Sequence, residues 1–92
     1  MDLKKIRKEI SRLDHQVVKL LNQRMEFTLR ATRFKTKIQD KKREKEILDI
    51  VSQIPVRFID KEFVKRLYTD IMAESRRLQA KRPKLVGFLG DH

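Results

Sequence analysis

The sequence contains no cysteine, no tryptophan and only two histidines. The lack of cysteine excludes disulfides, thiolate metal sites and cysteine nucleophiles, and with His15 and His92 as the sole imidazoles we expect no zinc site. No apolar run approaches the roughly 18 residues that a membrane-spanning helix needs. The first ten residues, MDLKKIRKEI, also lack the apolar core of a signal peptide. We therefore expect a soluble, cytoplasmic protein without a membrane partner.

Glycine and proline are scarce as well, with two of each in 92 residues. Both glycines, Gly87 and Gly90, lie in the last six residues, and the prolines are Pro55 and Pro83. Residues 1–54 thus contain no strong helix breaker, and Lys, Arg, Glu, Leu and Ile are abundant. This composition predicts an all-α fold in one small domain, which can bury only a limited core.

Acidic residues are outnumbered by basic ones. The chain has 24 Lys and Arg against 13 Asp and Glu, so its formal net charge is +11. Such an excess of positive charge predicts an anionic partner, which is either a nucleic acid or a small polyanion.

The first long segment has an apolar residue at alternating steps of three and four. Ten of the eleven positions in this series, which we call the seam, are apolar: Leu3, Ile6, Ile10, Leu13, Val17, Leu20, Arg24, Phe27, Ala31, Phe34 and Ile38. The pattern predicts one helix from about residue 3 to residue 37, with Asp2 as its N-cap. This helix would be roughly 50 Å long, whereas a globule of this size is only about 30 Å across. Because one chain cannot cover the whole seam, we expect a second copy to do so in an intertwined homodimer.

Two shorter helices are expected to follow. Asp40 is suited to cap a helix that runs to about Ser52, and Asp60 a third helix that runs to about Ala80. These three helices define an expected helical domain over residues 1–82, followed by a tail over 83–92. The tail contains KLVGFLGDH, an apolar run before a glycine, which is typical of a first strand. It is therefore either disordered or the start of a further domain.

Polar residues interrupt the apolar pattern of the long helix. Arg24 occupies a seam position, and a buried guanidinium needs an anion, so it forms either a structural ion pair or an anion-binding site. Lys35 follows eleven residues later, close to three helical turns, so both side chains project from nearly the same face about 16 Å apart.

The shorter helices carry two further polar groups. Ser75 and Gln79 are four residues apart on one face of the third helix, where apolar residues are expected. The second helix begins with Asp40, Arg43 and Glu44. One such cluster is usually a solvated surface, but three clusters that interrupt or flank apolar faces indicate a polar pocket.

Arg7 sets a geometric condition on that pocket. It lies 28 residues before Lys35, about 42 Å along the helix, so one chain cannot bring both residues to one small ligand. An antiparallel partner helix can, if its Arg7 lies opposite the interval between Arg24 and Lys35. The two helices would then cross near Val18 and form two equivalent sites.

Together these residues resemble the all-helical class of chorismate mutases. The resemblance covers roughly residues 3–80 and rests on IRKEISRLDHQVVKLLNQRM, on the lysine eleven residues after the arginine, on DKKREKEIL and on AESRRLQ. It implies three helices in an intertwined antiparallel dimer. It also implies an isomerase of aromatic amino acid biosynthesis that rearranges chorismate to prephenate without a cofactor or metal.

The resemblance also implies roles for the polar residues. Arg7 would come from the partner subunit, and Arg24 would grip a substrate carboxylate. Lys35 would contact a carboxylate and the ether oxygen, to which Gln79 would also donate. The second helix would contribute Asp40, Arg43 and Glu44, with Glu44 accepting from the substrate hydroxyl, and the third Ser75. Ala31 and Met72 would line the pocket. The interval from Lys35 to Asp40 is shorter than in the family pattern.

Two other classes of protein remain open from the residues alone. A basic helical protein that binds nucleic acid would explain the net charge, but the basic residues are spread over every expected helix rather than gathered in one stripe. A structural coiled-coil dimer would explain the seam but not Ser75 and Gln79. The tail resembles the opening of a prephenate dehydratase domain, which would make the chain the mutase portion of a bifunctional enzyme.

Overall fold

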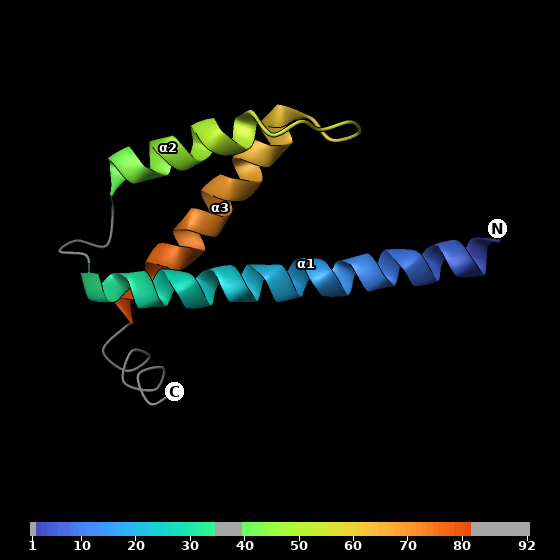
Figure 1. The fold of residues 1–92 in the computed structure, drawn as a ribbon, viewed down its shortest axis with the longest axis horizontal. Coiled ribbons are helices and arrows are strands. Elements are labelled where there is room, and N and C mark those ends of the chain that lie inside the picture. Colours follow the sequence, from blue (N-terminus) through green and yellow to red (C-terminus); the bar gives the residue numbers. More distant parts are fainter. Residues whose placement is uncertain (1, 35–39, 82–92) are drawn as a thin grey trace.

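The computed structural model describes residues 2–34 and 40–81. Along the chain these form α1 (Leu3–Ala31), a 3₁₀ turn η1 (Thr32–Phe34), α2 (Lys41–Ser52) and α3 (Lys61–Ala80), with no strand among them (Figure 1). The predicted all-α class and the three helices are confirmed. Lys35 and the tail over 83–92 lie outside the described residues.

Each α-helix begins directly after an aspartate in extended conformation. The carboxylates of Asp2, Asp40 and Asp60 accept hydrogen bonds from the backbone N–H groups of Lys5, Arg43 and Phe63, at 2.9, 3.0 and 2.7 Å. These bonds satisfy N–H groups that a helix start leaves without a partner. The three predicted N-caps are therefore confirmed.

The end of α1 differs from the prediction, because the α-helix stops at Ala31 and not near residue 37. The Thr32 hydroxyl donates to the Thr28 carbonyl at 3.0 Å, and the Thr32 N–H is shared among the carbonyls of Thr28, Leu29 and Arg30. A threonine that bonds back to the carbonyl four residues earlier competes with the helical ladder, and tightening to a 3₁₀ turn is common at helix ends. The sequence has no glycine or proline next to Ala31 that would mark the end of this helix.

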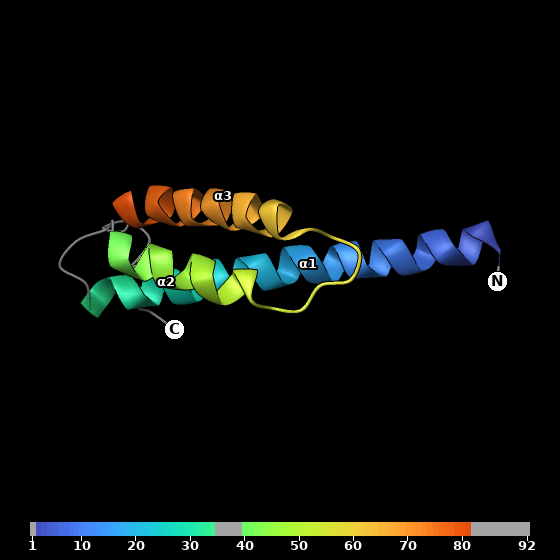
Figure 2. The same ribbon diagram turned by 90° about the horizontal axis from the view of Figure 1, so that it is seen from above.

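α3 packs against both of the other helices. It runs from the end of α2 back to the C-terminal half of α1, and the N-terminal half of α1 projects alone past both shorter helices (Figures 1 and 2). The buried apolar side chains are few and lie where the helices meet: Leu29, Val51, Val64, Ile71 and Met72. The core is therefore small and is confined to one end of a structure whose longest dimension is 51 Å.

No residue in 2–34 or 40–81 covers the N-terminal part of the seam. Its six members there have exposed fractions between 41 and 63%: Leu3, Ile6, Ile10, Leu13, Val17 and Leu20. Near its C-terminal end, α1 contacts α3 through Thr28 and buries Leu29, which lie one and two residues after the seam position Phe27. A straight α-helix drifts by about 20° per heptad from a 3.5-residue repeat, so the packed face moves off the seam along a helix of this length.

No helix in the described part of the chain is long and apolar enough to cross a membrane. Within residues 2–34 and 40–81 there is also no group of three His, Cys, Asp or Glu residues that could hold a metal ion.

Candidate active site

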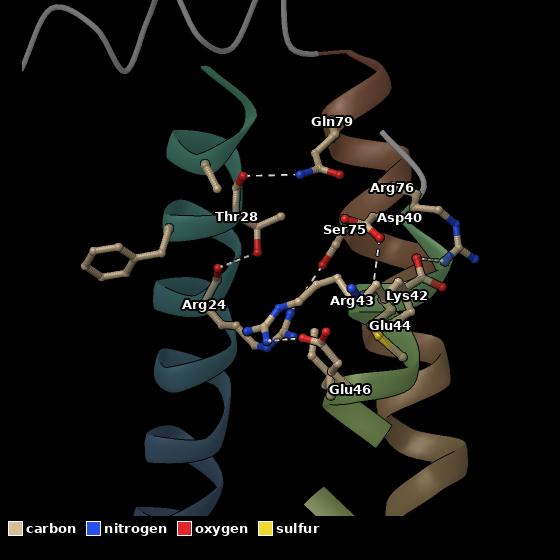
Figure 3. Close-up of a pocket in the computed structure, with 14 residues that line it drawn as sticks. Arg24, Thr28, Asp40, Lys42, Arg43, Glu44, Glu46, Ser75, Arg76 and Gln79 are labelled. Carbon is tan, nitrogen blue, oxygen red and sulfur yellow. Dashed lines mark hydrogen bonds and ion pairs between the residues drawn. The ribbon is translucent and has the colours of Figure 1, made fainter. Parts of the chain in front are cut away.

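A cavity of about 620 Å³ lies between the C-terminal half of α1, the start of α2 and the C-terminal half of α3. Its lining consists of Arg24, Phe27, Thr28 and Ala31 from α1, Asp40, Lys42, Arg43, Glu44, Glu46 and Ile47 from α2 and its cap, and Met72, Ser75, Arg76 and Gln79 from α3 (Figure 3). Its volume falls in the range of roughly 300–1,000 Å³ that is typical of sites for small molecules. Both apolar residues expected to line the pocket, Ala31 and Met72, are among these.

Arg24 is half-buried on the α1 side of the cavity. Its Nη1 donates to the Ser75 hydroxyl at 3.4 Å, and its guanidinium carbon stands 5.6 Å from the centre of the Tyr68 ring. No carboxylate within residues 2–34 and 40–81 pairs with it. A guanidinium held by neutral partners keeps both its charge and spare donors, which favours an anion-binding role for Arg24 over a structural ion pair.

Ser75 is buried, and its hydroxyl donates to the Ile71 carbonyl at 2.9 Å, four residues earlier on α3. With its single proton used in this bond, the Ser75 oxygen is left to accept the bond from Arg24. The side chain therefore ties the guanidinium on α1 to α3 without neutralising it.

Gln79 lies one turn further along α3, and only 2% of it is exposed. Its Nε2 donates to the backbone carbonyl of Thr28 at 3.3 Å. A carbonyl can only accept, so this bond fixes which end of the amide faces α1 (Figure 3). The second N–H of Nε2 remains for a ligand in the cavity, and it is a neutral donor.

On the opposite wall, α2 contributes charged side chains that are already engaged. The Asp40 carboxylate caps the helix through the Arg43 N–H, and the Arg43 guanidinium lies 3.5 Å from Glu46, with both side chains about half exposed. Glu44 forms an ion pair across to Arg76 on α3, with 2.5 Å between Nη1 and Oε2.

The acidic side chains of the cavity all have partners, whereas two of its basic side chains have no carboxylate partner among the described residues. Each of its three acidic residues, Asp40, Glu44 and Glu46, has a hydrogen-bond or ion-pair partner. Of its basic residues, Arg24 and Lys42 have no carboxylate partner among the residues that the structure describes. The free charge of the cavity is positive, which suits an anionic ligand.

Comparison with known families decides the assignment. The model of the family described as chorismate mutase type II matches residues 6–80. The chain belongs to this family. A solved structure, the crystal structure of chorismate mutase from Helicobacter pylori in complex with prephenate, superposes with a TM-score of 0.81 at 33% sequence identity. The match covers 89% of this chain and 93% of that one. The search of curated protein sequences found no match.

Six of the eight site residues expected of a chorismate mutase come together in the cavity: Arg24, Asp40, Arg43, Glu44, Ser75 and Gln79. Lys35 lies outside the described residues. Arg7 lies on the projecting half of α1, 17 residues before Arg24 and about 25 Å from it along the helix. It does not line this chain's own cavity, and its role in the partner's site stays a prediction.

The sequence analysis missed six residues that also line the cavity: Phe27, Thr28, Lys42, Glu46, Ile47 and Arg76. Arg76 could have been noticed, because it lies three residues before Gln79 and shares that side of α3. Its partner Glu44 lies 32 residues away in sequence, so the pair depends on how α2 packs on α3. Thr28 acts through its backbone carbonyl, which no side-chain pattern reveals.

Proposed function

We propose that this chain catalyses the rearrangement of chorismate to prephenate. Membership of the chorismate mutase family supports this assignment. The observation that carries it is Arg24, which has no carboxylate partner among the described residues and lines the same cavity as the neutral donor Gln79.

The reaction is a unimolecular Claisen rearrangement, so it requires no nucleophile, metal or redox cofactor. The substrate is a dianion whose enolpyruvyl side chain must fold over the ring before bonds can change. Guanidinium groups that grip the carboxylates hold that conformation, and orientation of this kind can contribute several kcal/mol to the lowering of a barrier. In this chain Arg24 would grip a carboxylate, with Arg7 of a partner subunit and Lys35 as the other expected contacts.

Negative charge grows on the ether oxygen as its bond to carbon breaks. The second N–H of Gln79 and the ammonium of Lys35 would donate to that oxygen. These bonds become stronger in the transition state than in the ground state, and this difference is what accelerates the reaction. A millionfold acceleration corresponds to about 8 kcal/mol, which orientation and electrostatic stabilisation can supply together.

We further propose that the active form is an intertwined antiparallel homodimer that crosses near Val18. The uncovered seam supports this, since burying the six half-exposed side chains on each of two chains contributes on the order of 10 kcal/mol to association before its entropic costs. A micromolar dimer requires about 8 kcal/mol. The cytoplasmic location, the domain boundary at residue 82 and a dehydratase domain after the tail stay predictions.

The direct test is the ultraviolet absorbance of chorismate incubated with the purified chain. We expect absorbance to fall in proportion to enzyme concentration and prephenate to accumulate. A folded protein that leaves chorismate intact would refute the proposal. If that protein also bound duplex DNA or RNA with a steep salt dependence, the alternative of a nucleic-acid-binding protein would replace it.

A further inference from the structure

The ion pair between Glu44 and Arg76 differs from every other ion pair among the described residues. The other five join side chains three or four residues apart on one helix. Glu44 and Arg76 instead join α2 to α3, and their side chains are only 23% and 31% exposed. An ion pair shielded in this way is screened less by salt than a surface pair.

The pair lies in the wall of the cavity, and both of its members line it (Figure 3). Arg76 Nη1 donates to Glu44 Oε2 at 2.5 Å. The second carboxylate oxygen, Oε1, accepts no hydrogen bond from any residue in 2–34 or 40–81. Glu44 therefore has one oxygen held and one oxygen available.

We propose that Arg76 is a positioning residue that holds Oε2 of Glu44 so that Oε1 is presented to the ring hydroxyl of the substrate. This inference rests on the proposed function, in which Glu44 accepts from that hydroxyl.

Two physical effects support a role for Arg76 beyond joining two helices. A glutamate on the first turn of a helix has three side-chain torsions, and ordering them at the moment of binding would weaken the contact with substrate. The hydrogen bond from Arg76 orders them in advance. Its positive charge also offsets the carboxylate, which would otherwise repel a dianion from the cavity.

The test is a double-mutant cycle on mutase activity with wild type, Arg76→Ala, Glu44→Gln and the double variant. Arg76→Ala should lower kcat/KM by about 10- to 150-fold, the range expected for one hydrogen bond to a charged group. If Arg76 acts through Glu44, adding Arg76→Ala to Glu44→Gln should lower kcat/KM by less than about twofold further. Arg76→Lys keeps the charge and the aliphatic stem, so it should recover part of the loss and serves if the alanine variant does not fold.

Arg77→Ala is the matched control, since Arg77 is the next residue on α3 and forms an exposed ion pair with Glu74 outside the cavity. It should leave kcat/KM unchanged. A chorismate analogue that lacks the ring hydroxyl provides the second readout. Relative to wild type, Arg76→Ala should lose less activity on this analogue than on chorismate, because the contact of Glu44 with the hydroxyl is missing in both enzymes and only the repulsion of the dianion remains. A role in stability alone would not predict this difference.

Three results would overturn the inference while wild-type activity stands. They are losses that multiply in the double variant, an equal loss on the analogue without the hydroxyl, and a lower melting temperature of Arg76→Ala with unchanged kinetics. The first two would mean that Arg76 contacts the substrate carboxylates itself, and the third that the pair serves only the fold. An inactive wild type would instead refute the proposed function, and this inference with it.

Discussion

Gln79→Glu replaces a neutral donor by a group that can donate only when it is protonated. In the wild type, Nε2 donates to the Thr28 carbonyl at 3.3 Å in a position that is almost fully buried. The substitution keeps size and shape but turns a carboxylate oxygen towards that carbonyl. Burial and the opposing acceptor both favour the protonated form, so they raise the pKa of the introduced carboxyl in the folded chain.

The raised pKa of the introduced carboxyl determines how the stability of the Gln79→Glu variant changes with pH. The variant has its full stability below the carboxyl's pKa in the unfolded chain and loses stability as the pH rises towards its pKa in the folded chain. Each pH unit in that window costs about 1.4 kcal/mol. Activity should follow the same direction. Loss of one donor to the developing oxyanion costs about 3 kcal/mol, or roughly 100- to 1,000-fold in rate, and protonation restores the donor.

The assay is chorismate absorbance and thermal melting measured from about pH 5 to pH 8. We expect the Gln79→Glu enzyme to be slow at neutral pH and to recover towards about pH 5, while the wild type stays nearly flat. Gln53→Glu makes the same chemical change at an exposed position after α2, outside the cavity and the seam, and should follow the wild type. If Gln79→Glu had near-normal activity and no pH dependence, Gln79 would not donate to the ether oxygen.

The remaining predictions concern assembly and stability. Sedimentation at micromolar concentration should show a dimer, and a folded monomer of 11.1 kDa would contradict the shared site. Arg7→Ala and Arg24→Ala should each be nearly inactive, and exchange of their subunits should restore about a quarter of wild-type activity, since half of the dimers then carry one intact site. Ile71→Ala should destabilise the fold by about 2–4 kcal/mol in denaturant melts, and Ile71→Val by about 1. The hydrogen bond from Arg77 lowers the pKa of Glu74 in the folded chain. The pair therefore stabilises the fold above the pKa that Glu74 has in the unfolded chain, and this effect is lost as the pH falls through its lower pKa in the folded chain. Because both are exposed, Glu74→Gln should barely move the melting temperature at neutral pH.

Local signals in the sequence predicted the elements well, because each helix start is decided by one residue. Asp2, Asp40 and Asp60 each accept a backbone N–H three residues on, and short polar side chains do this in any tertiary context. The end of α1 could not be predicted in this way. It depends on Thr32 bonding to a carbonyl rather than on a glycine or proline.

The residues of the candidate site also fall into those that a local sequence pattern reveals and those that depend on how the helices pack. Arg24, Ser75 and Gln79 were visible because each is polar at a position where helical spacing demands an apolar residue, and the structure places all three in the cavity. Arg76 is marked only by its spacing of three residues from Gln79, since a charged residue next to a buried serine is otherwise ordinary on a helix. Its relation to Glu44 is set by the packing of α2 on α3, which one sequence does not encode in any short pattern.

The long helix connects the stability of this protein to its chemistry. Its C-terminal half supplies Arg24 to the cavity and Leu29 to a core that has five buried apolar side chains among the described residues, while no described residue covers the seam in its N-terminal half. Because small domains bury little apolar surface, we expect burial of the seam to contribute to folding. An antiparallel second copy would provide that burial and would bring its Arg7 towards the cavity at the same time. Association, folding and completion of the substrate site would then be one equilibrium, in which dilution lowers all three together.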